Sequence, residues 1–423
     1  MGRPGGTLAT MSSTAPSADL PVVDVPALRA QVPALAEGLA FFDGPGGTQV
    51  PAPVAAAVAA MLGSAVSNRK GPHHASRRAE EAVDEARRAV ADLVGGVPEG
   101  VVLGPSMTHL TYVVAGALGR TWGEGDEVVL TRLDHDANVR PWVQAAARAG
   151  ASVRWVDVDP ATGELVDPLA AVTDRTRLLA VTGASNALGT RPDVAALTAA
   201  ADAVGATSYV DGVHLTPHAP VDVAELGCDL YALSTYKLMG PHAAAVVADP
   251  VLLEGLRPDK LLPAPDEVPA RFEHGTPPFE LLPGVTAAVD LLADLVPGPG
   301  GTRRERLLRS ASALERSEAA VFARLLDGLG ALDGVTVVGA PARRTPTVSF
   351  RVAGASPRDT SRWLGSRGVA VSDGDYYARE LVEVLGLRAT GGMVRAGVAP
   401  YTDAGDVDRL LAAVAEVADG ARV

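Results

Sequence analysis

Lys237 stands out because lysine is nearly absent from this chain. The 423 residues include 37 basic ones, of which only Lys70, Lys237 and Lys260 are lysine. Lysine can lose its proton near neutral pH and act as an amine nucleophile, whereas arginine cannot. Lys237 follows the β-type run "LYALS" and precedes the turn "MGP". We therefore expect a nucleophilic amine at the end of a strand, rather than an ordinary solvated lysine.

Other residues with useful chemistry also follow β-type runs. Asp211 ends "SYVD", His135 follows "VVLTRLD", and Ser106, Met107 and Thr108 stand between a strand and a helix. Taken singly, they suit a turn carboxylate, a solvent-facing imidazole and a helix N-cap. Taken together, they can protonate a ring nitrogen, stack on a flat ring and bind a phosphate. With an amine nucleophile, this set suits pyridoxal phosphate.

The elements that position these residues alternate between strand and helix patterns. The β-type runs cover 99–104, 126–132, 177–185, 207–212, 229–235 and 243–249, and helical patterns cover 77–96, 108–122, 138–150 and 192–205. Such alternation predicts an α/β fold with a mostly parallel sheet flanked by helices. Ligands bind at the carboxyl ends of the strands in these sheets, where the candidate residues stand.

The chain is long enough for two domains. We expect an N-terminal arm over 1–40 with a disordered start, a large cofactor-binding domain over 41–295, and a smaller C-terminal α+β domain over 296–423. The stretch 261–284 is rich in proline and predicts a long, rigid loop. A helix is expected from Arg303 onwards, after the glycine- and proline-rich "LVPGPGGT".

Composition excludes several classes of protein. The net charge of −13 argues against a nucleic-acid partner, because phosphate backbones need a basic face. Neither a signal peptide nor an apolar run of membrane-spanning length occurs, so we expect no membrane partner and a cytoplasmic location. Cys228 is the only cysteine and begins a predicted strand in "ELGCDLYALS", which suits a small core residue. No metal ligands are assigned, and no phosphate-binding loop of the nucleotide-binding type occurs.

From about Phe41 to the C-terminus, the chain resembles fold-type I pyridoxal-phosphate enzymes of the class V aminotransferase group, which includes cysteine desulfurases. Six separated blocks carry the resemblance in the family's order: "DHDAN", "SNALGT", "SYVDGVH", "LSTYK", "FEHGTP" and "VRAGVAPY". The resemblance implies a Schiff base between Lys237 and the cofactor, with Asp211 on the pyridine nitrogen and His135 stacked on the ring. It further implies a homodimer with shared active sites.

The remaining site residues are implied by the same resemblance. Ser234 and Tyr236 belong to the lysine block, His214 replaces the glutamine that contacts the ring hydroxyl, and Asn186 lies beside ring or substrate. Two further assignments come from the last two blocks. Thr276 reaches the phosphate bound in the neighbouring subunit, and Arg395 binds the carboxylate of the amino-acid substrate. Tyr236 and His214 depart from the family's usual histidine and glutamine.

The persulfide-forming cysteine of true desulfurases is missing. The corresponding C-terminal loop reads "GVAVSDGDYYAREL", and Cys228 lies elsewhere. We therefore favour a C–S lyase that eliminates a thiol from a cysteine S-conjugate. Transamination, epimerisation, decarboxylation or oxidative deamination, and a non-catalytic cofactor-binding relative remain the alternatives. Lys70, His73 and His74 lie in a loop that either faces solvent or touches substrate.

Overall fold

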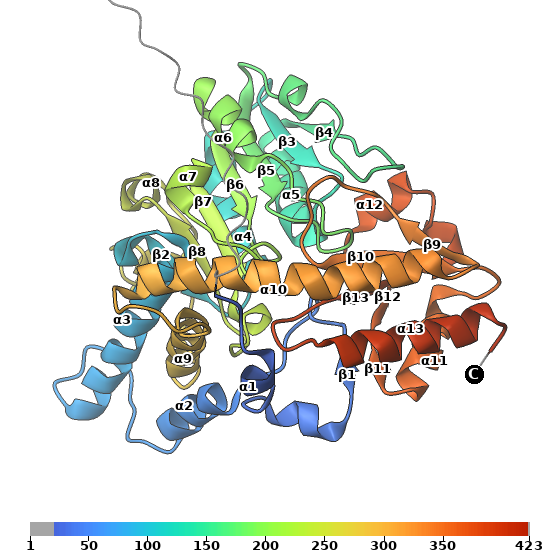
Figure 1. Ribbon diagram of the computed structural model, residues 1–423. Helices are drawn as coiled ribbons and strands as arrows, with labels where there is room; N and C mark the ends of the chain where they lie inside the picture. Colours follow the sequence, from blue (N-terminus) through green and yellow to red (C-terminus); the bar gives the residue numbers. More distant parts are fainter. Residues whose placement is uncertain (1–20, 422–423) are drawn as a thin grey trace, which may run out of the picture.

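The computed structural model describes residues 21–421, so the first half of the expected N-terminal arm lies outside it. Two sheets organise the chain (Figure 1). The larger sheet contains seven strands: β2 (Val101–Gly104), β3 (Glu127–Thr131), β4 (Ser152–Val156), β5 (Thr176–Thr182), β6 (Thr207–Asp211), β7 (Leu230–Ser234) and β8 (Ala244–Ala248).

The larger sheet has the order β2-β8-β7-β6-β5-β3-β4. Strand β8 runs antiparallel to both of its neighbours, and the pairs from β7 to β4 are parallel. This arrangement confirms the expected mostly parallel sheet. Because β2 and β7 both run antiparallel to β8, β2 points the same way as the parallel strands. The carboxyl ends of β2, β3, β5, β6 and β7 therefore lie at one edge.

Alternate residues of these strands supply two different cores. In β5, Leu179 and Val181 join one core, whereas Leu178 and Ala180 join the other. The first core receives helices α3 (His74–Val94), α6 (Val194–Ala203) and α9 (Leu282–Ala293), and the second receives α4 (Met107–Leu118) and α5 (Arg140–Ala149). The period-two pattern of each strand thus explains why helices cover both faces of the sheet.

Further elements pack around this framework. They include α1 (Val25–Arg29), β1 (Ala40–Phe41), α2 (Ala52–Leu62), α7 (Val223–Leu226), α8 (Pro250–Gly255) and the 3-10 helix η7 (Ala270–Phe272). The proline-rich stretch 261–284 consists mainly of loop around η7, as its composition indicates. Strand β4, in contrast, was not predicted from the sequence. It lies at an edge and is only partly buried, so its apolar signal is weak.

The second sheet has the order β12-β13-β10-β9, with β9 (Val335–Val338), β10 (Thr347–Val352), β12 (Ser372–Gly374) and β13 (Met393–Gly397). Its core packs against α10 (Arg303–Ala331) and α13 (Ala404–Ala418). Helices α11 (Pro357–Ser366) and α12 (Arg379–Val384) and strand β11 (Val369–Ala370) complete this part. Strand β11 pairs with β1, so the chain's early residues join this side of the molecule.

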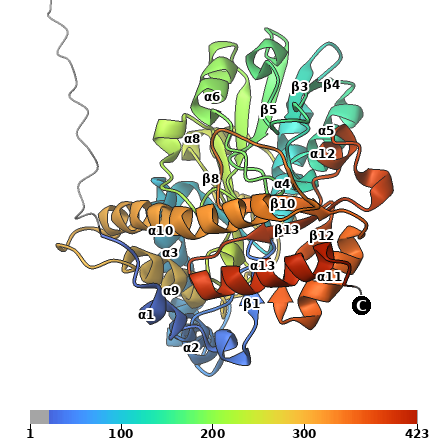
Figure 2. The same cartoon turned by 45° about the vertical axis from the view of Figure 1, so that its right-hand side comes forward.

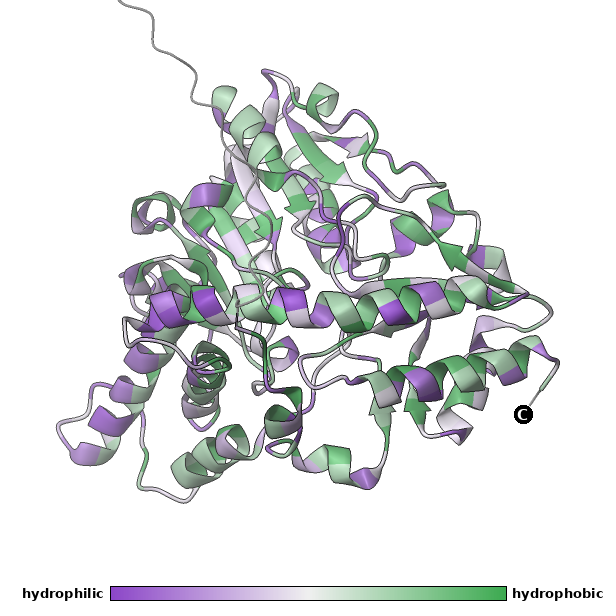
Figure 3. Ribbon diagram, viewed as in Figure 1, coloured by the Kyte–Doolittle hydropathy of each residue, from purple (hydrophilic) through white to green (hydrophobic). Residues whose placement is uncertain are grey.

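Helix α10 connects the two sheets. Figures 1 and 2 both show it running from the helices of the larger sheet to the four-stranded sheet. Hydrophobic and hydrophilic patches alternate along it in Figure 3, as expected of a helix that covers a core on one side. A capping box formed by Thr302 and Glu305 begins the helix at the position expected from sequence. None of the helices within residues 21–421 has the length and apolarity to span a membrane.

Candidate active site

A pocket lies where the carboxyl ends of the strands meet. Ten of the residues expected from sequence line it: Ser106, Met107, Thr108, His135, Asn186, Asp211, His214, Ser234, Tyr236 and Lys237. Each ends or follows β2, β3, β5, β6 or β7 along the chain. Because parallel strands present their carboxyl ends at one edge, residues more than 100 positions apart converge here.

Lys237 provides a buried amine in this pocket. It ends the 3-10 helix Thr235–Lys237 directly after β7, and only 7% of its surface is exposed. Burial and then the positive charge of Arg395 lower the pKa of Lys237 to about 8, against the opposing effect of Asp211. A lysine with this pKa carries a much larger neutral fraction near neutral pH than an exposed one. That is the form required of a nucleophile.

Asp211 ends the neighbouring strand β6 and pairs in register with Ala232 of β7. The N–H of Val213 donates to Asp211 Oδ1 at 2.9 Å. Burial raises the pKa of Asp211 to about 6, while that hydrogen bond and Lys237 favour the ionised form. At neutral pH the site therefore holds a buried carboxylate, which would stabilise a cation placed beside it.

His135 presents a neutral imidazole. Its Nδ1 accepts a hydrogen bond from the N–H of Ala137 at 3.0 Å, which assigns the ring proton to Nε2. Burial and then the charges of Lys237 and Arg395 lower the pKa of His135 to about 3. The ring centroid lies 5.3 Å from that of Tyr377, with 30° between the planes. A neutral ring held in a fixed plane suits stacking.

The start of helix α4 forms the polar end of the pocket. Ser106 Oγ accepts a hydrogen bond from the N–H of His109 at 3.1 Å, so Ser106 is the N-cap. The first-turn N–H groups of Met107 and Thr108 have no partner within the helix, and Thr108 adds a hydroxyl. This arrangement of donors at the positive end of a helix dipole suits a phosphate group.

His214, Ser234 and Tyr236 complete the wall near Lys237. His214 is buried, its Nε2 lies 3.0 Å from Thr347 Oγ1, and its Nδ1 has no protein partner. Burial and then neighbouring His218 lower the pKa of His214 well below its usual value. His214 therefore offers an unused ring nitrogen to a bound molecule.

Tyr236 stacks on His242, with ring centroids 4.7 Å apart and planes 6° apart.

Arg395 brings the second sheet next to this pocket, which Asn186 lines and Arg395 does not, although the charge of Arg395 acts on Lys237 and His135. Arg395 lies in β13, is buried, and donates through Nη1 to the main-chain oxygen of Asn186 at 2.9 Å. Its Nε has no partner, and neither does Asn186 Oδ1. Burial lowers the pKa of Arg395 to about 10. The guanidinium nevertheless remains protonated at neutral pH and is ready to bind an anion.

Thr276, His73 and His74, which are expected from sequence at the neighbouring subunit's phosphate or in a loop facing solvent or substrate, do not line this pocket. Thr276 is exposed and lines a separate pocket with His109 and His274. His73 caps helix α3 by accepting from the N–H of Ser76 at 3.3 Å, and His74 is exposed. Neither histidine lines the pocket around Lys237. His73 thus has a structural role, and Thr276 faces away from this chain's Lys237.

Comparison with known proteins identifies the family. The model described as "Aminotransferase class-V" matches residues 40–410. The chain belongs to the class V aminotransferase family. It is therefore a pyridoxal-phosphate-dependent enzyme, a lyase or transferase that acts on an amino acid. This result confirms the resemblance expected from the six sequence blocks and the expected fold type I.

The relatives of this class V enzyme include cysteine desulfurases. A probable cysteine desulfurase from Pseudomonas aeruginosa is 34% identical over 405 residues, covering 91% of this chain and 96% of the relative. An uncharacterised protein from Mycobacterium tuberculosis is 35% identical over 398 residues, covering 93% and 99%. The apo structure of the cysteine desulfurase from Thermococcus onnurineus superposes with a TM-score of 0.84, at 26% identity, covering 94% and 99%.

The pocket fits the cofactor of the class V enzymes. Two buried polar atoms, His214 Nδ1 and Asn186 Oδ1, have no hydrogen-bond partner in the protein. Buried polar atoms are normally hydrogen-bonded, so these two indicate that a polar molecule binds here. Around them stand an amine with a lowered pKa, a buried carboxylate and a neutral imidazole. The start of α4 adds a phosphate-binding end. These four features match the aldehyde, pyridine nitrogen, ring face and phosphate of pyridoxal phosphate.

Sequence reasoning missed two residues close to this machinery. Asp134 is 1% exposed, accepts hydrogen bonds from Thr131 Oγ1 and from Asn138 Nδ2, the latter at 2.7 Å, and lies near Asp211. Burial raises the pKa of Asp134 to about 8, and the charge of Asp211 adds to the rise. The ring of Tyr376, in the loop after β12, lies over the guanidinium of Arg395. The "DHD" motif could have drawn attention to Asp134, whereas no local signal indicates the contact of Tyr376.

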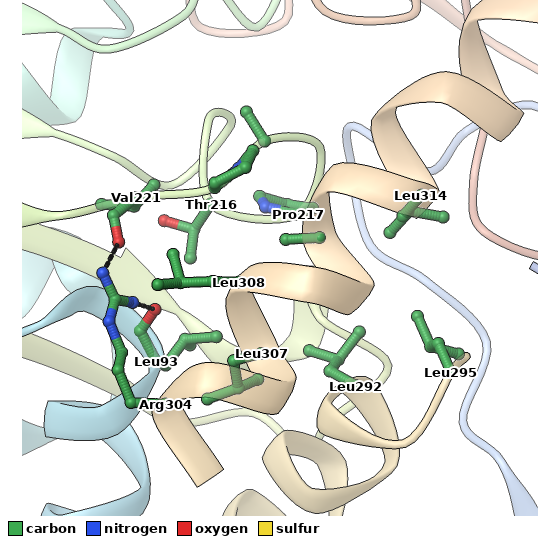
Figure 4. Close-up of a pocket in the computed structure, with 13 residues that line it drawn as sticks. Leu93, Thr216, Pro217, Val221, Leu292, Leu295, Arg304, Leu307, Leu308 and Leu314 are labelled. Carbon is green, nitrogen blue, oxygen red and sulfur yellow. Dashed lines mark hydrogen bonds between the residues drawn. The ribbon is translucent and has the colours of Figure 1, made fainter. Parts of the chain in front are cut away.

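A second pocket, beside helix α10, is lined mainly by apolar side chains (Figure 4). Leu307, Leu308 and Leu314 face Pro217 and Leu292 across it. Its cation, Arg304, donates to the oxygens of Asp92, Leu93, Val221 and Asp222. The arginine therefore ties α10 to the larger sheet's helices, and the pocket is a gap in apolar packing.

Proposed function

We propose that this enzyme is a C–S lyase that cleaves cysteine S-conjugates by β-elimination. The substrate loses a thiol from Cβ, and the remaining three-carbon fragment leaves as pyruvate and ammonium after water is added. One observation carries the choice among family reactions: the loop that holds a persulfide-forming cysteine in desulfurases holds Tyr376 and Tyr377 here. The relatives named as desulfurases support sulfur-containing amino acids as the substrate class.

The chain's only cysteine does not substitute for the missing thiol. Cys228 is half-buried before β7, and its Sγ lies 3.9 Å from the carbonyl oxygen of Val223. Burial raises the pKa of the Cys228 thiol to about 12. Because the thiolate is the nucleophile, such a cysteine is inert near neutral pH. Cys228 also does not line the pocket around Lys237. Transfer of sulfur through a protein persulfide is thus disfavoured.

The residues divide the work of holding the cofactor. Lys237 would supply the amine for the cofactor's aldehyde, and Ser106, Met107 and Thr108 would hold its phosphate. Asp211 would keep a proton on the pyridine nitrogen, and His135 would stack on the ring face. When bound, pyridoxal phosphate acts as an electron sink that weakens the bonds around the amino acid's Cα.

The same side chains then act on the amino acid. Arg395 binds its carboxylate through two N–H groups, and Asn186 contributes a polar contact beside it. Fixing the carboxylate selects the Cα–H bond for cleavage. With the cofactor and an amino acid bound, the amine of Lys237 would accept the Cα proton, a role that suits its lowered pKa. The electron pair left by that proton expels the thiolate from Cβ, which takes a proton as it leaves.

The decisive experiment is a product assay over a panel of cysteine S-conjugates. The proposal predicts equal amounts of pyruvate, ammonium and thiol, with neither carbon dioxide nor a protein persulfide. Amino-group transfer to a keto acid, a D-amino acid product or release of carbon dioxide would instead show transamination, epimerisation or decarboxylation. Absence of any product, with cofactor bound, would indicate a non-catalytic relative.

We also propose a homodimer with shared active sites. Thr276 lies in the long loop 261–284, is exposed, and does not line the pocket around its own Lys237. The resemblance to the family implies that Thr276 contacts the phosphate bound by the neighbouring subunit. Such a shared site requires an extensive permanent interface. Sedimentation at micromolar concentration should show a dimer, and a monomer that binds cofactor tightly would contradict this arrangement.

A further inference from the structure

The loop between β12 and α12 has an unusual backbone at two adjacent tyrosines. Tyr376 has φ of +53° and Tyr377 has φ of +61°, in the left-handed region that bulky residues rarely adopt. The loop begins directly after β12, whose Ser372 pairs in register with Arg395 of β13. Reversal of the chain after β12 therefore returns Tyr376 to the strand that carries Arg395. Such strained residues occur often at functional sites.

Tyr376 contacts three parts of the candidate active site. Its ring centroid lies 4.4 Å from Arg395 Cζ, within the range of a cation–π contact. Its hydroxyl donates to the carbonyl oxygen of Met393, on the same strand as Arg395. Its own carbonyl oxygen accepts from Asn186 Nδ2 at 2.9 Å. One residue thus touches both Arg395, which is assigned to the amino acid's carboxylate, and Asn186, which is expected beside ring or substrate.

These contacts leave the binding edges of Arg395 and Asn186 free. An aromatic ring covers the face of a guanidinium, whereas carboxylates bind its edge. Arg395 Nη1 is fixed by the carbonyl of Asn186, and its Nε keeps an unused N–H. Asn186 Nδ2 donates to Tyr376, so its unpartnered Oδ1 has a fixed direction and is an acceptor, which suits a donor group and not a carboxylate. Arg395 is therefore the group that is held in place for a carboxylate before an amino acid binds.

We propose that Tyr376 is a positioning residue that pre-orients Arg395 for the carboxylate of the amino-acid substrate, both directly and through Asn186, whose carbonyl holds Arg395 Nη1. The inference rests on the proposed role of Arg395. The loop after β12 would then have a different function from the corresponding loop of cysteine desulfurases. Tyr376 lies in the loop where those enzymes have their persulfide-forming cysteine. Pre-orientation increases affinity because the guanidinium loses less rotational freedom when the ligand arrives.

The test measures equilibrium binding to the holoenzyme, followed through the absorption of the bound cofactor. The probes are L-alanine and ethylamine, which differ only by the carboxylate. Tyr376→Gly removes the ring and favours the observed backbone, because glycine adopts positive φ readily. We expect this variant to bind alanine about tenfold more weakly, the size of a lost cation–π contact, with ethylamine affinity unchanged. Cofactor affinity should also stay unchanged.

Two matched variants separate the ring from the loop. Tyr377→Gly brings the same backbone change at the next residue, whose ring is 72% exposed, lies beside His135 and does not contact Arg395, so its alanine affinity is compared with its own ethylamine and cofactor affinities. Tyr376→Phe keeps the ring and removes the hydroxyl, with its contacts to Met393 and Ser349. Both should bind alanine within about threefold of the wild type, which corresponds to less than a typical neutral hydrogen bond. A tenfold loss in either would overturn the role of the ring.

A double variant distinguishes failure of this inference from failure of the proposed function. If Tyr376 acts through Arg395, Tyr376→Gly should weaken alanine binding little further in an Arg395→Ala background. Should Arg395→Ala bind alanine like the wild type, the carboxylate assignment itself is wrong. Should Arg395→Ala bind weakly while Tyr376→Gly binds normally, only the positioning role is wrong. Equal losses for alanine and ethylamine in Tyr376→Gly would also overturn it.

Discussion

Arg395 Nη1 donates to the carbonyl oxygen of Asn186 at 2.9 Å, which joins strand β13 of the small sheet to the loop after β5 of the large one. Both partners also contact Tyr376. The proposed carboxylate site is therefore built where the two sheets meet. Amino-acid binding is expected to depend on the relative position of the two sheets, as well as on the individual side chains.

Replacing Arg395 should mainly damage amino-acid binding. We expect Arg395→Ala to weaken binding by about 2–5 kcal/mol, because it removes a charged pair from a closed site. Arg395→Lys should recover part of this loss, since it keeps the charge but not the two-pronged geometry. Titration of each variant with an amino acid measures the effect. Wild-type affinity in Arg395→Ala would show that another group binds the carboxylate.

Replacing Asp211 should mainly damage the chemical step. In its proposed role, Asp211 would stabilise charge that develops in the ring only after a Cα bond breaks, so its loss should lower kcat more than it weakens binding. We expect Asp211→Asn to turn over at least about 100-fold more slowly, with an amino-acid affinity close to that of the wild type. Single-turnover kinetics measure both quantities. Normal turnover in this variant would contradict the role assigned to Asp211.

Asp134 should make the cofactor-free protein less stable as pH rises. Its folded-state pKa of about 8 lies above its unfolded value near 4, so between these values the folded protein holds a proton that the unfolded chain has lost. The free energy of unfolding therefore falls with rising pH, at up to about 1.4 kcal/mol per unit across this window. Below pH 4 this residue contributes no slope.

Denaturant unfolding between pH 5 and pH 8 tests this expectation. Asp134→Asn cannot ionise, so its stability should fall less steeply with pH than that of the wild type. The same change at the exposed Asp174 serves as the control and should leave the slope unchanged. Parallel pH profiles for the wild type and Asp134→Asn would show that Asp134 titrates normally.

Cys228→Ala should leave turnover largely intact. Burial raises the pKa of this thiol to about 12, and the residue lies outside the pocket around Lys237. Steady-state rates with a cysteine S-conjugate should agree with the wild type within about twofold, because a buried neutral thiol takes no part in the chemistry. Loss of activity, together with a persulfide trapped on Cys228, would restore a desulfurase mechanism.

Much of the fold and of the pocket lining could be predicted because both follow from strand periodicity. Asp211 and Lys237 each follow a short apolar run, and parallel strands bring such positions to one edge. The reversed direction of β8 was not predictable in this way, because a buried strand has the same apolar pattern in either direction. The roles of the pocket residues remain predictions.

Contacts made by loops were beyond sequence reasoning. Tyr376 meets Arg395 only because two tyrosines adopt left-handed backbone angles after β12. Tyrosine seldom adopts such angles, so local preference predicts a different path. Burial of Asp134 likewise depends on how Thr131 and Asn138 fold around it. Both features arise from tertiary packing that overrides local tendencies.

The central claim is that Lys237 binds the cofactor covalently. Borohydride reduction of the holoenzyme fixes the cofactor to the lysine that carries it, and peptide mapping then identifies that residue. Lys70 and Lys260 are built-in controls, because Lys70 is exposed and Lys260 pairs with Asp266 at 3.0 Å. The account predicts the label on Lys237 alone. A label on Lys70 or Lys260, with Lys237 unmodified, would contradict it.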